Sequence, residues 1–199
     1  MQQTLKEIFC RAPFFRRTVV AELLELRRRI LRADAPHLSA SFPGDDDPQT
    51  WHFGAFENDQ TIACVTFIRS NWPQIVPGSQ GETGSQIAAA SLGDARSNIA
   101  AGSQIVGGKS LKPGEPEPAW QLRGMAVSAS YQGGGIGRSL LHYAETELAA
   151  ASPVRLWWCN ARVSALPFYQ KLGWTIASGE FSVDGIGLHR KLLFRSEVP

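Results

Sequence analysis

The sequence predicts one α/β domain, and three observations support this prediction. The chain has 199 residues, close to the length of about 150 residues that is common for a single domain. Hydrophobic residues make up 43% and charged residues 19%, a balance that favours a packed core over a disordered chain. Segments with helical periodicity alternate with strand-like apolar runs along the chain. We therefore expect a sheet with helices packed against it.

The N-terminal part of the chain predicts a strand, a helix and a polar loop. Residues 3–9 are a candidate strand, and residues 18–33 predict a helix because apolar side chains recur every three or four positions. The three consecutive arginines at 27–29 predict a solvent-exposed helix face. Asp45, Asp46 and Asp47 stand among prolines and predict a solvated turn, with attraction of a cationic amine as the alternative.

The middle of the chain predicts a hairpin followed by a long insertion. Strands at 51–57 and 61–69 are joined by a short turn. No aromatic residue then occurs between Trp72 and Trp120, and glycine and serine are frequent. Such a segment cannot bury enough apolar surface to offset its ordering entropy. We therefore predict a flexible insertion at about 74–118 inside a single domain spanning 1–199, with at most a short helix at 86–92.

Regular structure is predicted again after the insertion. The expected elements are a strand at 120–127, a glycine-rich turn, a helix ending near 151, a strand at 154–159, a short helix at 164–171 that Gly173 ends, and strands at 174–183 and 188–194.

Composition excludes several classes of protein. A net charge of +2 gives no reason to expect nucleic-acid binding. No apolar run reaches the roughly 18 residues of a membrane span, and the N-terminus lacks the apolar stretch of a secretory signal. The cysteines are widely spaced and the histidines scattered, so we expect no disulfide framework and no metal site. Cys64 and Cys159 lie in apolar runs and predict buried thiols, which favours the reducing cytoplasm.

The glycine-rich turn at residues 132–138, Gln-Gly-Gly-Gly-Ile-Gly-Arg, is the segment with the clearest chemistry. Successive backbone N–H groups at the start of a helix attract an anion, so a phosphate or pyrophosphate is expected there. The dinucleotide pattern G-x-G-x-x-G fails in every frame. Residues 102–110 come near to a P-loop but are one residue too long and lack a preceding apolar strand.

Two motifs in order resemble the GNAT superfamily of acetyl-CoA-dependent N-acetyltransferases. Met125-Ala126-Val127 followed by Gln132-x-x-Gly135-x-Gly137 resembles its acyl-CoA signature, and 168–174, Phe-Tyr-Gln-Lys-Leu-Gly-Trp, resembles its later helix. The resemblance covers about 119–194. It implies a GNAT-like α/β fold with a mixed, mainly antiparallel sheet of six to seven strands flanked by helices. The implied reaction is direct attack of a primary amine on acetyl-CoA, without a metal.

The resemblance also implies roles for individual residues. Main-chain groups of Met125, Ala126 and Val127 would pair with the pantetheine arm, and Asn160 would bond its amide. Tyr169 would protonate the departing thiolate, and Glu180 and His189 are the candidate general bases. The pyrophosphate would be held by the turn residues Gln132, Gly133, Gly134, Gly135, Ile136, Gly137 and Arg138.

The acceptor is left open by the sequence: a small-molecule amine or a peptide or protein amine would both suit the family, and a homodimer would be ordinary for it. We expect no nucleic-acid or membrane partner. Two alternatives to the enzyme remain at this point. One is a non-catalytic acyl-CoA-binding regulatory module, and the other is a nucleotide-binding enzyme that uses the glycine turn for ATP or a nicotinamide cofactor.

Overall fold

The computed structural model describes residues 12–72, 105–106, 109–110 and 116–198. The predicted elements at 3–9 and 86–92, and most of the predicted insertion, lie outside these residues. The described elements are β1 (Phe14–Thr18), η1 (Val20–Glu22), α1 (Leu24–Leu31), β2 (Trp51–Glu57), β3 (Gln60–Asn71), β4 (Ile105–Val106), β5 (Lys109–Ser110), β6 (Pro118–Val127), η2 (Ala129–Tyr131), α2 (Ile136–Ala151), β7 (Leu156–Arg162), η3 (Val163–Ala165), α3 (Leu166–Gln170), β8 (Thr175–Ile176), β9 (Phe181–Val183) and β10 (Gly187–Arg195).

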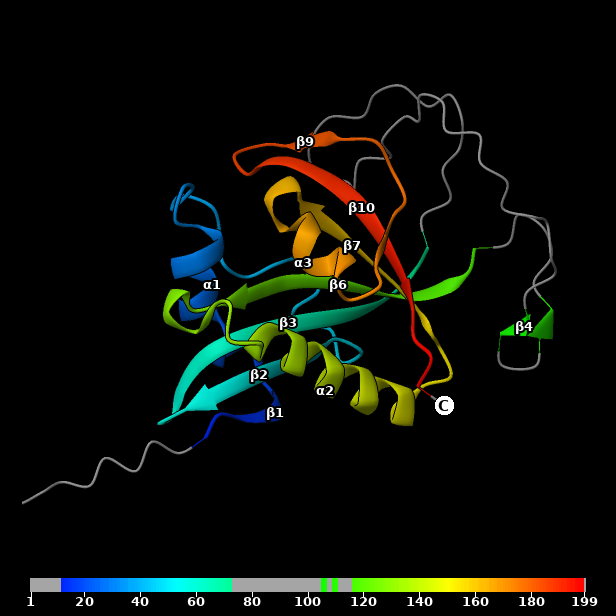
Figure 1. Cartoon of the computed structure of the whole chain (residues 1–199), viewed down its shortest axis with the longest axis horizontal. Helices are drawn as coiled ribbons and strands as arrows, with labels where there is room; N and C mark the ends of the chain where they lie inside the picture. The colour runs from blue at the N-terminus through cyan, green and yellow to red at the C-terminus, as the bar shows by residue number, and fades with distance from the viewer. Residues whose placement is uncertain (1–11, 73–104, 107–108, 111–115, 199) are drawn as a thin grey trace, which may run out of the picture.

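One eight-stranded sheet organises the molecule (Figure 1). Its strands follow the order β1-β2-β3-β6-β7-β10-β8, with β9 paired to β10. Only β6 and β7 run parallel, so the α/β fold with a mixed, mainly antiparallel sheet is confirmed. The sheet exceeds the expected six to seven strands for two reasons. The unpredicted β1 pairs with β2, and the run at 174–183 is divided into β8 and β9.

The predicted helix at 18–33 is wrong in its first third. Thr18 pairs with His52 as the last residue of β1, and Val19 is still extended with φ −107° and ψ 154°. Strand pairing therefore overrides the local apolar periodicity, and the α-helix begins only at Leu24, after one turn of 3-10 helix. By contrast, β2 and the end of α2 at Ala151 lie where the sequence predicts them.

Helices cover both faces of the sheet. Because side chains alternate along a strand, Ala63 and Val65 of β3 belong to the large core beneath α2, whereas Cys64 between them packs with Leu23 and Leu26 near α1. Figure 1 shows α2 lying across β2 and β3 on one side. The sheet is thus sandwiched, with α1 on one face and α2 and α3 on the other.

The buried thiols are confirmed. Cys64 and Cys159 are both free and buried. Burial raises the pKa of the Cys64 thiol to about 12 and raises that of Cys159 as well. Both side chains therefore behave as small apolar groups within the sheet.

A buried ion pair corrects two predictions at one residue each: Arg27 in the arginine run predicted as solvent-exposed, and Asp45 in the acidic turn predicted as solvated. Arg27 Nη1 lies 2.7 Å from Asp45 Oδ2, and neither side chain has exposed surface. Arg27 also donates to Thr66 Oγ1 at 2.5 Å, and the Phe42 N–H donates to Asp45 at 2.7 Å. The loop carrying Asp45 is therefore fastened to α1 and β3. Arg28, the next residue, is exposed as predicted.

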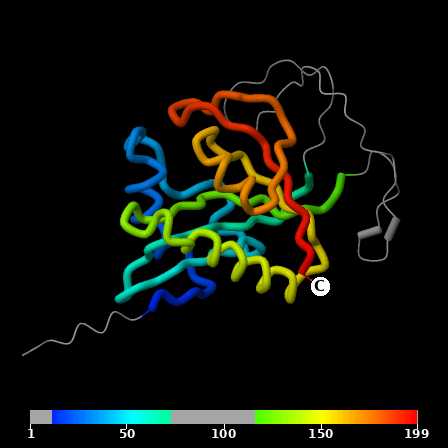
Figure 2. Tube along the Cα trace, viewed as in Figure 1, coloured from blue at the N-terminus to red at the C-terminus, as the bar shows by residue number. Residues whose placement is uncertain are grey.

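The C-terminal tail returns to the end of α2 (Figure 2). Ser196 Oγ donates to Glu145 at 2.6 Å, and Arg155 Nε donates to the Val198 carbonyl at 2.8 Å. The first bond ties the residue after β10 to α2, and the second ties the tail to the segment between α2 and β7. Within the described part of the chain, no helix is both long and apolar enough to cross a membrane.

Candidate active site

The sheet opens in the middle, where β6 and β7 diverge. The two parallel strands pair at only three positions, Trp120, Leu122 and the residue between them, opposite 157–159. Beyond Leu122, β6 has an irregularity against β3, because two residues, Gly124 and Met125, oppose one. Gly124 has a φ of +63°, and a Cβ there would lie 2.9 Å from Arg27 Nε. Glycine is therefore required for the strand to bend past the buried arginine.

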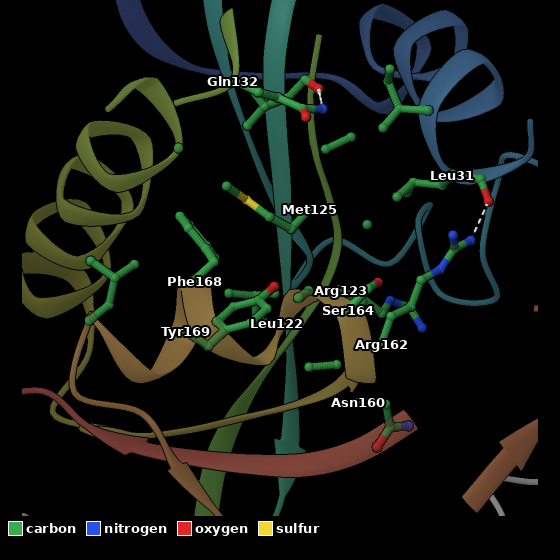
Figure 3. A pocket seen from close by; sticks show the side chains of 18 of the residues that line it. Leu31, Leu122, Arg123, Met125, Gln132, Asn160, Arg162, Ser164, Phe168 and Tyr169 are labelled. Atoms are coloured by element: carbon green, nitrogen blue, oxygen red, sulfur yellow. Dashed lines mark hydrogen bonds between the residues drawn. The ribbon is translucent and has the colours of Figure 1, made fainter. Parts of the chain in front are cut away.

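A cavity of about 1130 Å³ occupies this opening. Every predicted cofactor-binding residue except Ile136 lines it, as do Tyr169 and His189, whereas Glu180 does not. Figure 3 shows Phe168 and Tyr169 of α3 on the side facing Met125, and Arg162 extending toward Leu31 at the end of α1. The structure thus brings the glycine turn, the bent edge of β6, and parts of β7, α3 and β10 to one pocket.

The glycine turn has the backbone conformation that the sequence indicates. Gly133 and Gly135 have φ values of +78° and +86°, and Gly135 is the N-terminal cap of α2. A Cβ at either position would meet nothing within 4 Å, so conformation rather than crowding selects glycine. Gln132 Nε2 donates to the Val127 carbonyl at 2.9 Å, which ties the turn to the end of β6.

Gly137, in the first turn of α2, has a different role. A Cβ there would lie 3.2 Å from Met125 Cε and 3.3 Å from the Phe168 ring. This glycine lets α2 approach β6 and α3 closely. The helix N-terminus is therefore held directly at the edge of the pocket.

Asn160 carries an unpaired polar atom in the pocket wall. It lies inside β7, not after it as predicted, because the strand continues to Arg162. Its Oδ1 is buried and has no hydrogen-bond partner among the described residues. Since buried polar atoms are almost always paired, this carbonyl oxygen is suited to accept an N–H from a bound ligand.

Tyr169 is fixed by aromatic packing. It is 5% exposed, and its ring lies 5.1 Å from Phe168 and 5.3 Å from Trp174, both edge to face. Burial raises the pKa of its hydroxyl well above the ordinary value, and nearby Cys159 contributes to the rise. The phenol is therefore neutral near pH 7 and can donate its proton.

His189 lies on the opposite face of the sheet from Tyr169. In the β7–β10 ladder it stands opposite Arg162, whereas Cys159, which faces α2 and α3, stands opposite Leu192. His189 Nδ1 lies 2.9 Å from the Gly187 carbonyl, an oxygen that can only accept, so Nδ1 carries the hydrogen. Desolvation lowers the pKa of His189, which leaves Nε2 unprotonated and able to accept a proton near pH 7.

Glu180, the other predicted base, is placed elsewhere. It pairs with Arg190 at 3.0 Å, and 43% of its side chain is exposed. Among the two candidate bases, His189 alone lines the pocket. No group of three or more His, Cys, Asp or Glu side chains suited to a metal occurs among the residues that the structure describes.

Three arginines of the pocket were missed by the sequence analysis. Arg32, Arg123 and Arg162 all line it. Arg162 follows Asn160 by two residues and so shares its strand face, a signal that a longer predicted β7 would have provided. Arg32 is brought there only by the position of α1, which no local pattern indicates.

The fold and the pocket together define the class of protein. The profile of the acetyltransferase (GNAT) domain matches residues 85–190, more than half of the chain. The chain therefore belongs to the GNAT family and is an acyltransferase, as the resemblance implied.

Individual relatives agree with this membership. An uncharacterised N-acetyltransferase of Bacillus subtilis (strain 168), YitI, is 26% identical over 170 residues, which cover 85% of this chain and 87% of the relative. The structure of an acyl-CoA N-acyltransferase from Pseudomonas aeruginosa matches with a TM-score of 0.58 at 11% identity, covering 93% of this chain and 100% of that one. An aminoglycoside 6′-N-acetyltransferase complexed with coenzyme A matches with a TM-score of 0.53 at 13% identity, covering 94% and 99%. The two structures show the shared fold.

Proposed function

We propose that this enzyme transfers the acetyl group of acetyl-CoA to a primary amine by direct attack. The observation that carries the proposal is the joining of two features in one pocket: an anion-binding turn at the start of α2 and the opening between β6 and β7. Acetyl-CoA supplies an activated thioester at the end of a long amide-containing arm and a diphosphate at its base. The pocket offers a complementary group for each part.

The residues present fit coenzyme A. Gly133 and Gly135 leave open space where side chains would otherwise stand, so a diphosphate can approach the main chain. Arg138, exposed in the first turn of α2, adds a full positive charge there. The unpaired Oδ1 of Asn160 suits an amide N–H of the pantetheine arm. The related fold that was solved with coenzyme A supports the same assignment.

Residues 125–127 suit the thioester end. The β6–β7 ladder stops at Leu122, so the edge of β6 from Met125 to Val127 is not paired with β7. An extended amide-containing arm can add to such an edge as a strand would. A main-chain N–H aimed at the thioester oxygen would stabilise the negative charge that develops there, a contribution of about 3 kcal/mol per donor.

Two residues on opposite faces of the sheet would handle the two protons. His189 Nε2 would accept the proton of the attacking amine on the α1 face. Tyr169 would donate its hydroxyl proton to the departing sulfur on the α3 face. A thiol in the same dry surroundings also has a raised pKa, as Cys159 does, so donor and acceptor stay matched despite the burial of the tyrosine.

Two measurements test the proposal. Thermal unfolding with coenzyme A, ATP and NAD should show stabilisation by coenzyme A alone, since only that ligand has a complementary group for each part of the pocket. Release of free thiol from acetyl-CoA should then depend on an added amine. Stabilisation by ATP or NAD but not by coenzyme A would contradict the cofactor assignment, and thiol release that no primary amine increases would contradict the acceptor class.

A further inference from the structure

The charges of the pocket lining are of one sign. No Asp or Glu lines the cavity among the described residues, whereas five basic side chains do: Arg32, Arg123, Arg138, Arg162 and Lys171. A polycationic acceptor would meet only like charge there. The pocket is therefore built for a ligand with negative charge.

These cations form two groups. Arg138 lies in the first turn of α2, directly after the glycine turn where the diphosphate is proposed. Lys171 follows α3, the helix whose Phe168 ring lies against Gly137 of α2. The other three lie at the α1 end of the pocket. Arg162 donates to the carbonyl of Leu31, the last residue of α1, and Arg32 follows directly.

We call Arg32, Arg123 and Arg162 the arginine group. Arg32 and Arg123 both approach the Phe42 ring, with Cζ at 5.0 and 5.8 Å from its centroid. Figure 3 shows Arg162 across the pocket from the start of α2, reaching toward Leu31, the residue before Arg32. We therefore treat the arginine group as separate from the proposed diphosphate site.

Two members of the arginine group lack a carboxylate partner in the described residues. Arg32 donates through Nε to the Ser39 carbonyl at 2.8 Å, and Arg162 donates through one terminal nitrogen to the Leu31 carbonyl at 2.7 Å. A neutral carbonyl oxygen accepts one N–H of a guanidinium group but does not compensate its positive charge. The remaining guanidinium nitrogens of Arg32 and Arg162 have no hydrogen-bond partner among the residues that the structure describes. Burial, followed by the charges of Arg162 and Arg27, lowers the pKa of Arg32.

The third member of the group is only partly neutralised. Arg123 lies 3.6 Å from Asp45 Oδ1, but the same carboxylate pairs more closely with Arg27, at 2.7 Å. One aspartate thus serves two guanidinium groups. The α1 end of the pocket therefore carries an excess of positive charge that an anionic ligand would balance.

We infer that the acceptor is an amine carrying a carboxylate a few bonds away, with the carboxylate bound by Arg162 and Arg32. The inference rests on the proposed function and names its substrate class. Guanidinium groups bind carboxylates through paired hydrogen bonds, and both residues have free nitrogens for this. Two kinds of molecule carry an amine and a carboxylate a few bonds apart: a free amino acid, and a peptide whose first residue is Asp or Glu.

The β7–β10 register explains why the amine and the carboxylate must be close to each other. Arg162 and His189 are direct cross-strand partners, so their Cβ atoms are about 5 Å apart on the same face of the sheet. A carboxylate on Arg162 would therefore leave an amine only a few bonds away within reach of His189 Nε2. The anchoring group and the candidate base are adjacent because of strand pairing alone.

The test compares amines that differ only in the carboxylate. One arm uses free α-amino acids against their carboxamides, and the other uses peptides beginning with Asp or Glu against peptides beginning with Asn or Gln. In one of the two arms we expect kcat/KM to be at least about tenfold higher for the carboxylate form than for the uncharged form. The arm that shows this difference tells whether the acceptor is a free amino acid or a peptide. Equal or better turnover of the uncharged forms in both arms would overturn the inference while leaving acetyl transfer itself intact.

Variants locate the binding group. Arg162→Gln should remove the preference by lowering kcat/KM for the carboxylate acceptor about tenfold while that for the carboxamide changes little, and Arg162→Lys should restore part of it. Arg28→Gln, on the exposed side of α1, is the matched control and should leave both unchanged. An equal loss for both acceptors, or a fall in coenzyme A affinity, would overturn the assignment of Arg162.

Binding gives a readout that does not need turnover. Calorimetric titration of the amino acid and its carboxamide into the protein, with and without coenzyme A, should detect the carboxylate form only. The Arg162→Gln and Arg32→Gln variants should each lose that binding. Equal binding of both forms would contradict the inference, whereas failure of coenzyme A to bind would contradict the proposed function instead.

Discussion

Replacing His189 by glutamine removes the candidate base while keeping a side chain that can hydrogen-bond. His189 is 6% exposed and bonds the Gly187 carbonyl through Nδ1. Glutamine can donate to that carbonyl but cannot accept a proton. A positioned general base contributes about 10²–10⁴-fold, so we expect kcat/KM to fall at least about 100-fold, equivalent to about 2.7 kcal/mol of barrier. Coenzyme A affinity should not change, because the glycine turn belongs to other elements.

The pH dependence makes the same test sharper. Desolvation lowers the pKa of His189 below the ordinary 6.5, so the imidazole is neutral at pH 7 and becomes protonated only in acid. We expect the wild-type kcat/KM to be level near neutrality and to fall with a slope of one proton below that lowered pKa. His189→Gln should lose this acid limb together with its activity.

Protonation also bears on stability, with a defined sign. Since the folded-state pKa is lowered, the unfolded chain binds the proton more readily. The free energy of unfolding should therefore be largest above about pH 6.5 and decline as the pH falls through the folded pKa. His52 has a lowered pKa for the same reason and adds to this decline. A His189→Gln enzyme with wild-type kcat/KM, or with an unchanged acid limb, would refute the assignment of the base.

Three further substitutions test the buried pair, the acid and the turn. Asp45→Asn should lower the free energy of unfolding by about 3–5 kcal/mol in urea titration, because it leaves a buried guanidinium without its charge partner, whereas Asp46→Asn should cost under about 0.5 kcal/mol; equal effects would argue against the pair. Tyr169→Phe should lower kcat about 100-fold in a thiol-release assay with coenzyme A affinity unchanged, and an unchanged kcat would remove the phenol from the mechanism. Gly135→Ala should cost about 1–2 kcal/mol of stability and weaken coenzyme A binding, because alanine must adopt a φ of +86° at the proposed diphosphate site. Gly179→Ala, at an open position outside the pocket, should leave coenzyme A binding unchanged, and equal affinity in both variants would contradict the proposed site.

Much of the sheet and of the glycine turn could be predicted because their signals are local. The strand-like run at 51–57 stands directly before a short turn and forms β2 with the same bounds. The glycines at 133 and 135 have positive φ values, a conformation that glycine adopts without the cost other residues bear. Apolar periodicity placed the end of α2 because the helix buries one continuous stripe against the sheet.

The parts that could not be predicted depend on residues far apart in the chain. Arg27 stands in a run of arginines that favours solvent, yet it is buried because Asp45, eighteen positions later, meets it. The end of β7 was underestimated because Asn160 and Arg162 are polar, although strand β10 pairs with them. Polar residues at an active site interrupt the apolar pattern of the strand that carries them, because they are selected for binding a ligand and not for packing.

The small number of rungs between β6 and β7 has a mechanical consequence. Three residue pairs join the half of the sheet that holds β1–β3 to the half that holds β10. The two halves can therefore change their relative angle about these pairs as about a hinge. Three of the six paired residues are buried tryptophans, Trp120, Trp157 and Trp158, and the Trp157 ring lies 4.7 Å from that of Phe67 in β3. Trp120 and Trp157 do not line the pocket. A change of side-chain volume at either residue would therefore alter the angle between the two halves of the sheet, and with it the width of the opening between β6 and β7, without replacing a residue of the pocket wall.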